Sequence, residues 1–236
     1  MRGLFVTATD TGVGKTVLAS ALLAAMLAAG EDVRPYKPAI TGLDEPPDAP
    51  WPPDDELLAR LAGMPRERVA PARFGPAVSP HLAAELAGRA LDPRELVERA
   101  RTLAGGERAR RALLVEGVGG LLVPLSDGYC VRDLARELAL PVLIAARPGL
   151  GTINHTLLTL AAAREAGLDV RAVVLTPWPA RPDALERSNM ATIARVGNIE
   201  VQGLPRVAGP DARELARAGE TLPWRKWWRS LESAQM

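Results

Sequence analysis

A chain of 236 residues that is 47% hydrophobic and 24% charged is long enough to bury a full core, and we expect one globular domain over residues 1–236. The formal net charge of +1 offers no basic face, which argues against nucleic acid or a membrane as a partner. The single cysteine, Cys130, excludes an internal disulfide and a CxxC pair, and no charged-then-apolar leader follows Met1. We therefore predict a cytoplasmic protein.

The first predicted strand, residues 4–6, leads into the loop TATDTGVGKT (7–16) and then into an apolar helix that continues to residue 29. A helix that begins after this loop directs unpaired N–H groups and the positive end of its dipole at the loop, which favours a polyphosphate. Lys15 would reach the terminal phosphates, and the Thr16 hydroxyl would coordinate Mg²⁺.

The loop departs from the strict GxxxxGK[ST] pattern at one position. Thr9 occupies the place of the first glycine, so Gly12 and Gly14 must supply the backbone freedom that the turn requires. The alternative is a glycine turn that only joins a strand to a helix.

Strands and helices alternate along the rest of the chain. Further apolar strands are expected at 32–36, 111–115, 141–146, 170–175 and 199–204, and helices with three-to-four apolar spacing at 54–62, 92–104, 131–138, 153–166, 182–196 and 210–218. The alternation predicts an α/β fold of the P-loop type, with a doubly wound, mainly parallel sheet flanked by helices. In such a sheet the ligand binds at the carboxyl ends of the strands.

Two segments of unusual composition interrupt this pattern. The proline-rich stretch 42–53 cannot be regular structure, and we predict a mobile loop over the site. Near the other end of the chain, Trp224, Trp227 and Trp228 could form a ligand cage or a stacking platform, but their helical spacing favours packing at the edge of the core or at a subunit contact.

Charged residues follow two of the predicted strands. Lys37 comes directly after the second strand and suggests a charge clamp on a transferring phosphoryl group, although a solvated lysine is the alternative. Glu116 ends the third strand, where an acid can hold Mg²⁺ together with the loop hydroxyl. Asp54 offers a second carboxylate or a helix cap, and Asp55 competes for either role.

The histidines give no metal signal. His81 and His155 are the two histidines of the chain, and they do not have the spacing of a zinc pair. His155 is as consistent with packing at a helix start as with a ligand.

Four motifs in order, TDTGVGKT (9–16), YKPxxTG (36–42), VEGxGGLLVP (115–124) and LGTINHTLLTL (150–160), resemble dethiobiotin synthetase, and the resemblance extends from residue 4 to about residue 207. It implies an enzyme of biotin biosynthesis that closes the ureido ring of dethiobiotin. The substrates would be 7,8-diaminononanoate, CO₂ and a nucleoside triphosphate. A carbamate on one amine would be phosphorylated to a carbamic-phosphoric anhydride, which the second amine attacks.

The resemblance also implies roles for individual residues. The catalytic residues would be Lys15, Lys37 and Thr11, and the ligands of Mg²⁺ would be Thr16, Asp54 and Glu116. The substrate would contact Thr11, Thr41, Gly119, Leu150, Gly151 and Asn154. The nucleotide would contact Gly12, Val13, Gly14, Lys15, Thr16, Val17, Asp54, Glu116, Gly117, Val118, Gly119, Thr176, Pro177, Pro205, Arg206 and Val207. The segment 150–154 implies a homodimer, because in the family the carboxylate tail of the substrate lies at a subunit interface.

Two positions differ from the usual family sequence. Ala8 replaces a glycine ahead of the loop, which should only tighten the turn. Thr176 stands where many members have an asparagine that reads adenine, and a hydroxyl cannot make the paired contact of a carboxamide. We therefore expect ATP or another nucleoside triphosphate to serve as co-substrate.

Other protein classes use similar loops. A partitioning or regulatory ATPase would have a signature lysine where this chain has Asp10. A small-molecule kinase would have an arginine-rich lid, and it would leave the EGxGG and LGTINH segments unexplained. A cobyrinate-type amidotransferase would need an added glutaminase domain.

Overall fold

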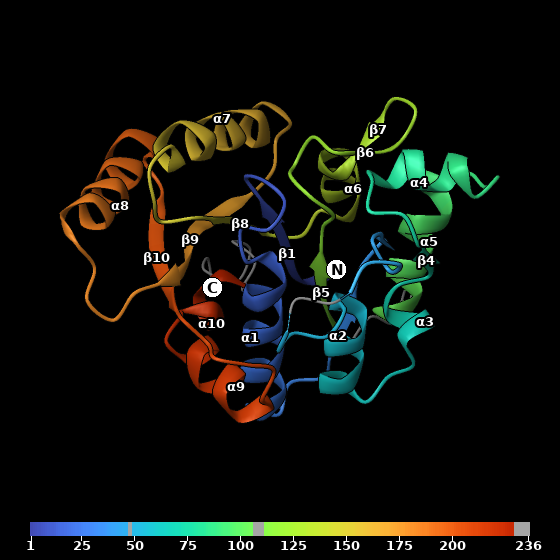
Figure 1. Ribbon diagram of the computed structural model, residues 1–236, viewed down its shortest axis with the longest axis horizontal. Coiled ribbons are helices and arrows are strands. Elements are labelled where there is room, and N and C mark those ends of the chain that lie inside the picture. Colours follow the sequence, from blue (N-terminus) through green and yellow to red (C-terminus); the bar gives the residue numbers. More distant parts are fainter. Residues whose placement is uncertain (47–48, 106–110, 229–236) are drawn as a thin grey trace, which may run out of the picture.

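The computed structural model describes residues 1–46, 49–105 and 111–228, and a six-stranded sheet lies at its centre (Figure 1). Across the sheet the strands are β10 (Glu200–Pro205), β9 (Val170–Trp178), β8 (Val142–Ala146), β1 (Arg2–Ala8), β5 (Ala112–Glu116) and β2 (Val33–Tyr36). Every neighbouring pair is parallel. Since the chain extends from the central β1 toward both edges, the predicted doubly wound parallel sheet is confirmed.

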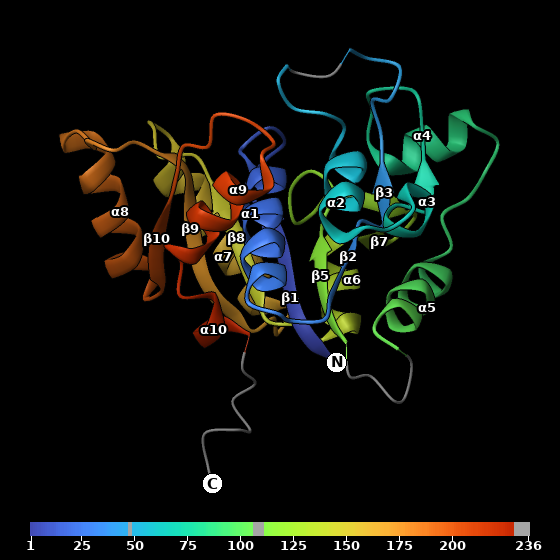
Figure 2. The ribbon, with the colours of Figure 1, turned by 90° about the horizontal axis from the view of Figure 1, so that it is seen from below.

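Helices cover both faces of the sheet (Figure 2). On one face lie α1 (Lys15–Ala28), α2 (Asp54–Ala62), α9 (Ala212–Glu220) and α10 (Trp224–Trp227), and on the other α5 (Pro93–Leu103), α6 (Val131–Leu138), α7 (Thr152–Glu165) and α8 (Ala184–Gly197). Successive side chains of a strand point to opposite faces. Leu4 and Val6 of β1 therefore pack under the first layer, while Phe5 packs under the second.

Helix α1 is apolar around most of its circumference because it is enclosed between the sheet, α2 and α9. It packs tightly against α9 at Gly219, where an added Cβ would lie 2.1 Å from the carbonyl oxygen of Ala21. Only glycine permits this separation. The helix that follows the loop is thus held on three sides, which fixes the position of its first turn.

Several short elements were not predicted from the sequence. They are β3 (Ala39–Ile40), β4 (Ala72–Arg73), β6 (Pro124–Ser126), β7 (Tyr129–Cys130), α3 (Arg66–Val69), α4 (Pro80–Leu86) and α10. Such short elements do not span enough residues for a periodic pattern to emerge. Strand β9 also exceeds its predicted end at residue 175 because Trp178 pairs with Pro205 of β10.

The proline-rich segment has no helix or strand in residues 42–46 and 49–53, while residues 47–48 lie outside the described residues. The three tryptophans near the C-terminus are buried, and the rings of Trp224 and Trp228 meet edge to face at 5.6 Å, so the packing prediction is confirmed. No helix within the described ranges combines the length and apolar character needed to cross a membrane.

Cys130 is partly exposed and precedes α6 as its N-cap residue. Its N–H and S–H groups both donate to Asp133, at 3.0 Å each. Burial and the bond to Asp133 raise the pKa of the thiol. A raised thiol pKa is typical of an unreactive, structural cysteine.

Candidate active site

The loop between β1 and α1 turns through two glycines in the left-handed region (dark blue in Figure 1). Gly12 has φ of 69° and Gly14, the N-cap residue of α1, has φ of 91°. At Gly14 an added Cβ would also lie 2.9 Å from Cγ2 of Thr176. Because glycine has no side chain to cap the helix, the first N–H groups of α1 are left to a ligand.

A charged cluster lies beside this loop at the carboxyl ends of β2 and β5. The Nζ of Lys37 is 2.7 Å from Oε1 of Glu116 and 2.8 Å from Oδ2 of Asp54. The hydroxyl of Thr16 donates to the same Glu116 oxygen at 2.8 Å. Lys37 and Glu116 are only 2% and 1% exposed, so both charges are held in a largely dry environment. The cluster joins residues from α1, α2, β5 and the end of β2.

Ion pairing within the cluster opposes the effect of burial on the pKa values of its charged groups. Burial alone would lower the pKa of Lys37, but the carboxylates of Asp54 and Glu116 raise it above its usual value. Burial alone would raise the pKa of Asp54, but the ammonium of Lys37 lowers it. For Lys15, burial and the charge of Lys37 together lower the pKa. A bound polyanion would oppose both effects and raise the pKa of Lys15 again, as in a loop built to receive one.

The two neighbouring aspartates are separated by the start of α2. Asp54 faces Lys37, whereas Asp55 is fully buried and pairs with Arg66 at 3.0 Å and with Arg73. Successive residues of a helix point about 100° apart, so only one of the two can face the loop. Asp55 thus stabilises the contact between α2 and the segment 66–73.

The oxygen atoms beside Thr16 fit a hard cation. Oε2 of Glu116 is buried and accepts no hydrogen bond from the described residues. Carboxylate and hydroxyl oxygens are the ligands that Mg²⁺ prefers, with water and phosphate oxygens completing its shell. No group of three or more His, Cys, Asp or Glu side chains in the described ranges forms a metal site.

Two of the other residues expected to bind substrate lie beside the loop or beside Asp54. An added Cβ at Gly119, which has φ of 59°, would lie 3.4 Å from the Thr11 hydroxyl. Gly117 donates its N–H to the carbonyl of Val6, which fixes the segment after β5 against β1. Thr41 and Asp54 line a hollow of about 370 Å³ under the proline-rich segment.

The segment from Leu150 to Asn154 forms the start of α7 and is mostly exposed. Gly151 is the N-cap residue with φ of 88°, and Leu150 is 91% exposed. Asn189 of α8 donates to the carbonyls of Pro148 and Gly149, which holds the approach to the helix. Within the described residues no hydrogen bond or ion pair links this segment to the lysine and carboxylate cluster.

The residues expected around the base lie at the ends of β9 and β10. Thr176 is buried against Gly14 of the loop, one residue before the exposed Pro177. Pro205, Arg206 and Val207 line a hollow of about 420 Å³ together with residues of α9. The pairing of Trp178 with Pro205 brings these two strand ends side by side.

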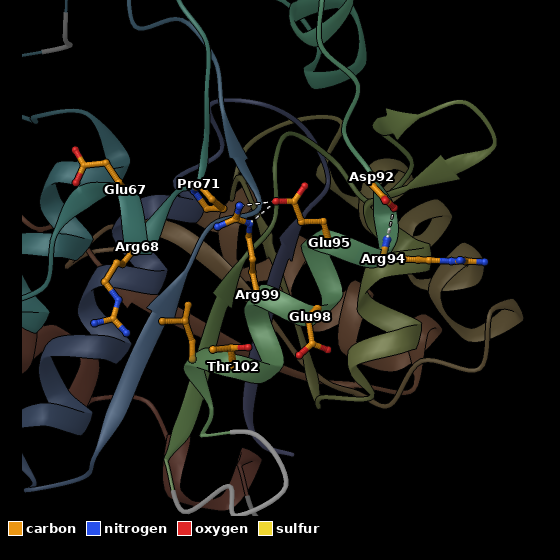
Figure 3. A pocket seen from close by; sticks show the side chains of 10 residues that line it. Glu67, Arg68, Pro71, Asp92, Arg94, Glu95, Glu98, Arg99 and Thr102 are labelled. Carbon is orange, nitrogen blue, oxygen red and sulfur yellow. Dashed lines mark hydrogen bonds and ion pairs between the residues drawn. The ribbon is translucent and has the colours of Figure 1, made fainter.

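A larger hollow of about 640 Å³ lies between α3 and α5 (Figure 3). Its lining mixes both signs of charge, and Arg99 is bonded to Glu95 across one helical turn. None of the expected site residues lines it. The hollow lined by Thr41 and Asp54 is smaller, but it adjoins the buried charges and is the better candidate for the site.

One cationic residue beside the loop was not singled out from the sequence. Arg147 follows β8 directly, and its Nη2 is 3.5 Å from the carbonyl oxygen of Thr11. Its position in the chain could have identified it as a candidate, because it is the first residue after a strand that adjoins β1.

The parallel sheet, the left-handed glycines and the uncapped start of α1 define a P-loop nucleoside triphosphate-binding protein. A family model described as an AAA domain matches residues 2–207. The chain is 46% identical to the ATP-dependent dethiobiotin synthetase of Anaeromyxobacter dehalogenans, with 94% of this chain and 96% of that one covered. It is 44% identical to the enzyme of Mycobacterium avium (84% and 85% covered) and 35% identical to that of Bacillus subtilis subsp. natto (88% and 89%). The chain belongs to the ATP-dependent dethiobiotin synthetase family, a family of ligases.

Solved structures with the same fold include two cell-division proteins. The cell division ATPase MinD of Pyrococcus furiosus has a TM-score of 0.55 at 17% identity, with 93% of this chain and 98% of that one covered. The MinC:MinD complex of Aquifex aeolicus gives a TM-score of 0.55 at 14% identity, covering 96% and 92%. Identities this low show the fold alone.

Proposed function

We propose that this protein is a dethiobiotin synthetase that carboxylates 7,8-diaminononanoate and closes its ureido ring at the expense of a nucleoside triphosphate. The observation that carries the proposal is the buried cluster of Lys37, Glu116 and Asp54 beside the P-loop. A regulatory switch needs to hydrolyse its nucleotide only slowly. A second lysine, buried where the terminal phosphate would lie, is better explained by transfer of that phosphate to a negatively charged acceptor.

The reaction divides into three steps. One amine of the substrate attacks CO₂ and loses a proton, which forms a carbamate. A carbamate oxygen then attacks the γ-phosphorus of the nucleotide, and the bond between the γ-phosphorus and the β-phosphate oxygen breaks. A carbamic-phosphoric anhydride forms, and the nucleoside diphosphate is released. The second amine attacks the carbonyl carbon of this anhydride and loses a proton, and phosphate leaves as the ring closes.

The lysines would act in the second step, in which two anions must approach each other. Lys15 and Lys37 stabilise the charge on the carbamate and on the moving phosphoryl group, and the N–H groups from Gly12 to Val17 bind the phosphates. Thr11 and Thr41 contact the carbamate or the amines, and Gly119 leaves room for the substrate beside Thr11.

Thr16, Asp54 and Glu116 would hold Mg²⁺. When bound, the cation would neutralise the charge that develops on the phosphate oxygens. The bond from Thr16 to Glu116 and the unpartnered second oxygen of Glu116 support this assignment. Displacing Lys37 from its pairing with Asp54 would free that carboxylate oxygen for the cation, and the ammonium would then be available to the reacting groups.

The carboxylate tail of the substrate would lie at the start of α7, with contacts from Leu150, Gly151 and Asn154, in a homodimer. Three leucines near this helix, Leu122, Leu150 and Leu158, are exposed. Leu122 and Leu158 line a hollow of about 390 Å³ that also includes Thr11. Exposed apolar side chains gathered beside a site favour an interface, and a second copy of the chain is its proposed occupant.

The base would lie between Thr176–Pro177 and the segment from Pro205 to Val207. Because Thr176 packs against Gly14 and has no carboxamide, we propose that other triphosphates can replace ATP.

A direct assay tests the proposal. The protein is incubated with 7,8-diaminononanoate, bicarbonate, Mg²⁺ and ATP, and dethiobiotin is measured by mass spectrometry. We expect one dethiobiotin for each ADP formed. ATP hydrolysis without dethiobiotin would contradict the proposal and favour a regulatory ATPase, while a phosphorylated diamine as the final product would favour a small-molecule kinase.

A further inference from the structure

Arg147 reaches the P-loop from the side opposite the lysine and carboxylate cluster. It follows β8, which pairs with β1 on one side, whereas β5 and β2 lie on the other side of β1. Glu116 ends β5 and Lys37 follows β2. A phosphate chain in the loop would therefore have Lys37 on one flank and Arg147 on the other.

The guanidinium of Arg147 lies over the bend of the loop. Its Nη2 is 3.5 Å from the carbonyl oxygen of Thr11 and 3.6 Å from the point that a Cβ on Gly12 would occupy. Since Gly12 has no side chain, nothing separates the guanidinium from the loop backbone. A Cβ at position 12 would make ordinary van der Waals contact with Nη2, so the guanidinium packs directly on this part of the loop.

The contacts of Arg147 leave its charge available to a ligand. The bond to Thr11 is at the long limit of hydrogen bonding and uses one of five N–H donors. Among the residues that the structure describes, no carboxylate lies within ion-pair distance of this side chain. Asp10, the nearest acid in sequence on the loop, instead accepts the N–H of Thr11 at 2.7 Å.

We propose that Arg147 contacts the transferring phosphoryl group and stabilises the charge that develops on it. The inference rests on the proposed function. A guanidinium can bind two phosphoryl oxygens at once, which an ammonium cannot, and its fork would face the group that passes from the diphosphate to the carbamate. In P-loop enzymes such an arginine acts on the transition state more than on the bound nucleotide.

The test compares Arg147→Ala and Arg147→Lys with the parent. We expect kcat to fall by about 10²–10³ in the alanine variant, with KM for ATP within about threefold of the parent. Lysine should restore only part of the rate, and added guanidinium ion should raise the rate of the alanine variant alone. Arg101→Ala, an exposed arginine on α5, is the matched control and should behave as the parent.

A second measurement does not depend on the identity of the substrate. ADP with aluminium fluoride and Mg²⁺ mimics a phosphoryl group in transfer, and its affinity should fall by about 10²-fold in Arg147→Ala, while the affinity for ADP changes by less than about threefold. Equal affinities in variant and parent would overturn the proposal. So would a raised KM for the diamine with an unchanged kcat, because Arg147 would then bind the substrate. If the parent makes no dethiobiotin, the proposed function fails, and this measurement still decides the role of Arg147.

Discussion

In the proposed mechanism Lys37 acts on the reacting groups, and in the structure it also pairs with Asp54 and Glu116. One substitution at this position should therefore affect both activity and stability. We expect Lys37→Ala to lower kcat for ring closure by about 10²–10³, because a buried cation at the reacting centre is lost. The same change leaves the carboxylate of Glu116 buried without its ammonium, so the melting temperature should fall as well. Activity is therefore measured well below the unfolding transition, which circular dichroism locates for each variant.

The double variant Lys37→Ala with Glu116→Gln separates the two effects. Removing both charges should recover part of the lost melting temperature, while the rate stays low. If Lys37→Ala keeps a rate within about threefold of the parent, the lysine does not act on the reacting groups.

Adjacent carboxylates should differ in their effect on Mg²⁺. We expect Asp54→Asn and Glu116→Gln each to raise the Mg²⁺ concentration at half-maximal activity by at least about tenfold, since a neutral amide is a poor ligand for a hard cation. Asp55→Asn is the control. It should leave the Mg²⁺ midpoint unchanged but lower the melting temperature, because its partners are Arg66 and Arg73. A shifted midpoint in Asp55→Asn alone would reverse the assignment.

Thr176 should set the selectivity for the base. A site that hydrogen-bonds one base can reject others by up to about 10⁴-fold, and without a carboxamide most of that penalty disappears. We expect kcat/KM for GTP, CTP or UTP to be comparable to that for ATP, and Thr176→Asn to shift the ratio toward ATP. A parent preference for ATP above about 10²-fold would mean that another group reads adenine.

At the scale of elements, the contact between α1 and α9 fixes the helix that carries the P-loop. We expect Gly219→Ala to destabilise the protein by about 1–3 kcal/mol, because its Cβ would meet the backbone of Ala21 and force the helices apart. Urea unfolding measures the change. Gly149→Ala is the control, since an added Cβ there meets nothing within 4 Å, and its effect should stay within about 1 kcal/mol. Equal effects would show that α9 can move away without cost.

At the scale of the whole molecule, the exposed leucines near α7 predict a self-association that the catalytic site needs. We expect Leu158→Glu to convert a dimer to a monomer and to raise KM for the diamine by at least about tenfold, which corresponds to about 1.4 kcal/mol of lost binding. Light scattering after size-exclusion chromatography gives the mass. Leu86→Glu on α4 changes a leucine of similar exposure, 63% against 62%, and should leave both mass and KM unchanged. A parent that is monomeric at assay concentrations would contradict the prediction.

The sequence by itself determined the sheet and the loop. Strands that are apolar throughout must be covered on both faces, and the alternation with amphipathic helices admits few topologies. Gly12, Gly14, Lys15 and Thr16 are adjacent in the chain, so the phosphate cradle they form is visible without knowledge of any tertiary contact. Two-residue strands such as β3 are invisible to the same reasoning, since their pairing depends on a partner distant in sequence.

The tertiary structure decided how the distant charges meet. Lys37 could have been a solvated residue and Asp54 a helix cap, and only the assembled fold brings Asp54 and Glu116 within hydrogen-bonding distance of Lys37. Which of Asp54 and Asp55 pairs with Lys37 depended on the direction in which α2 begins, and the position of Arg147 depended on β8 lying next to β1. The physical reason is that local propensity acts over a few residues, whereas electrostatic and hydrogen-bonding contacts between strand ends exist only once the sheet has been assembled.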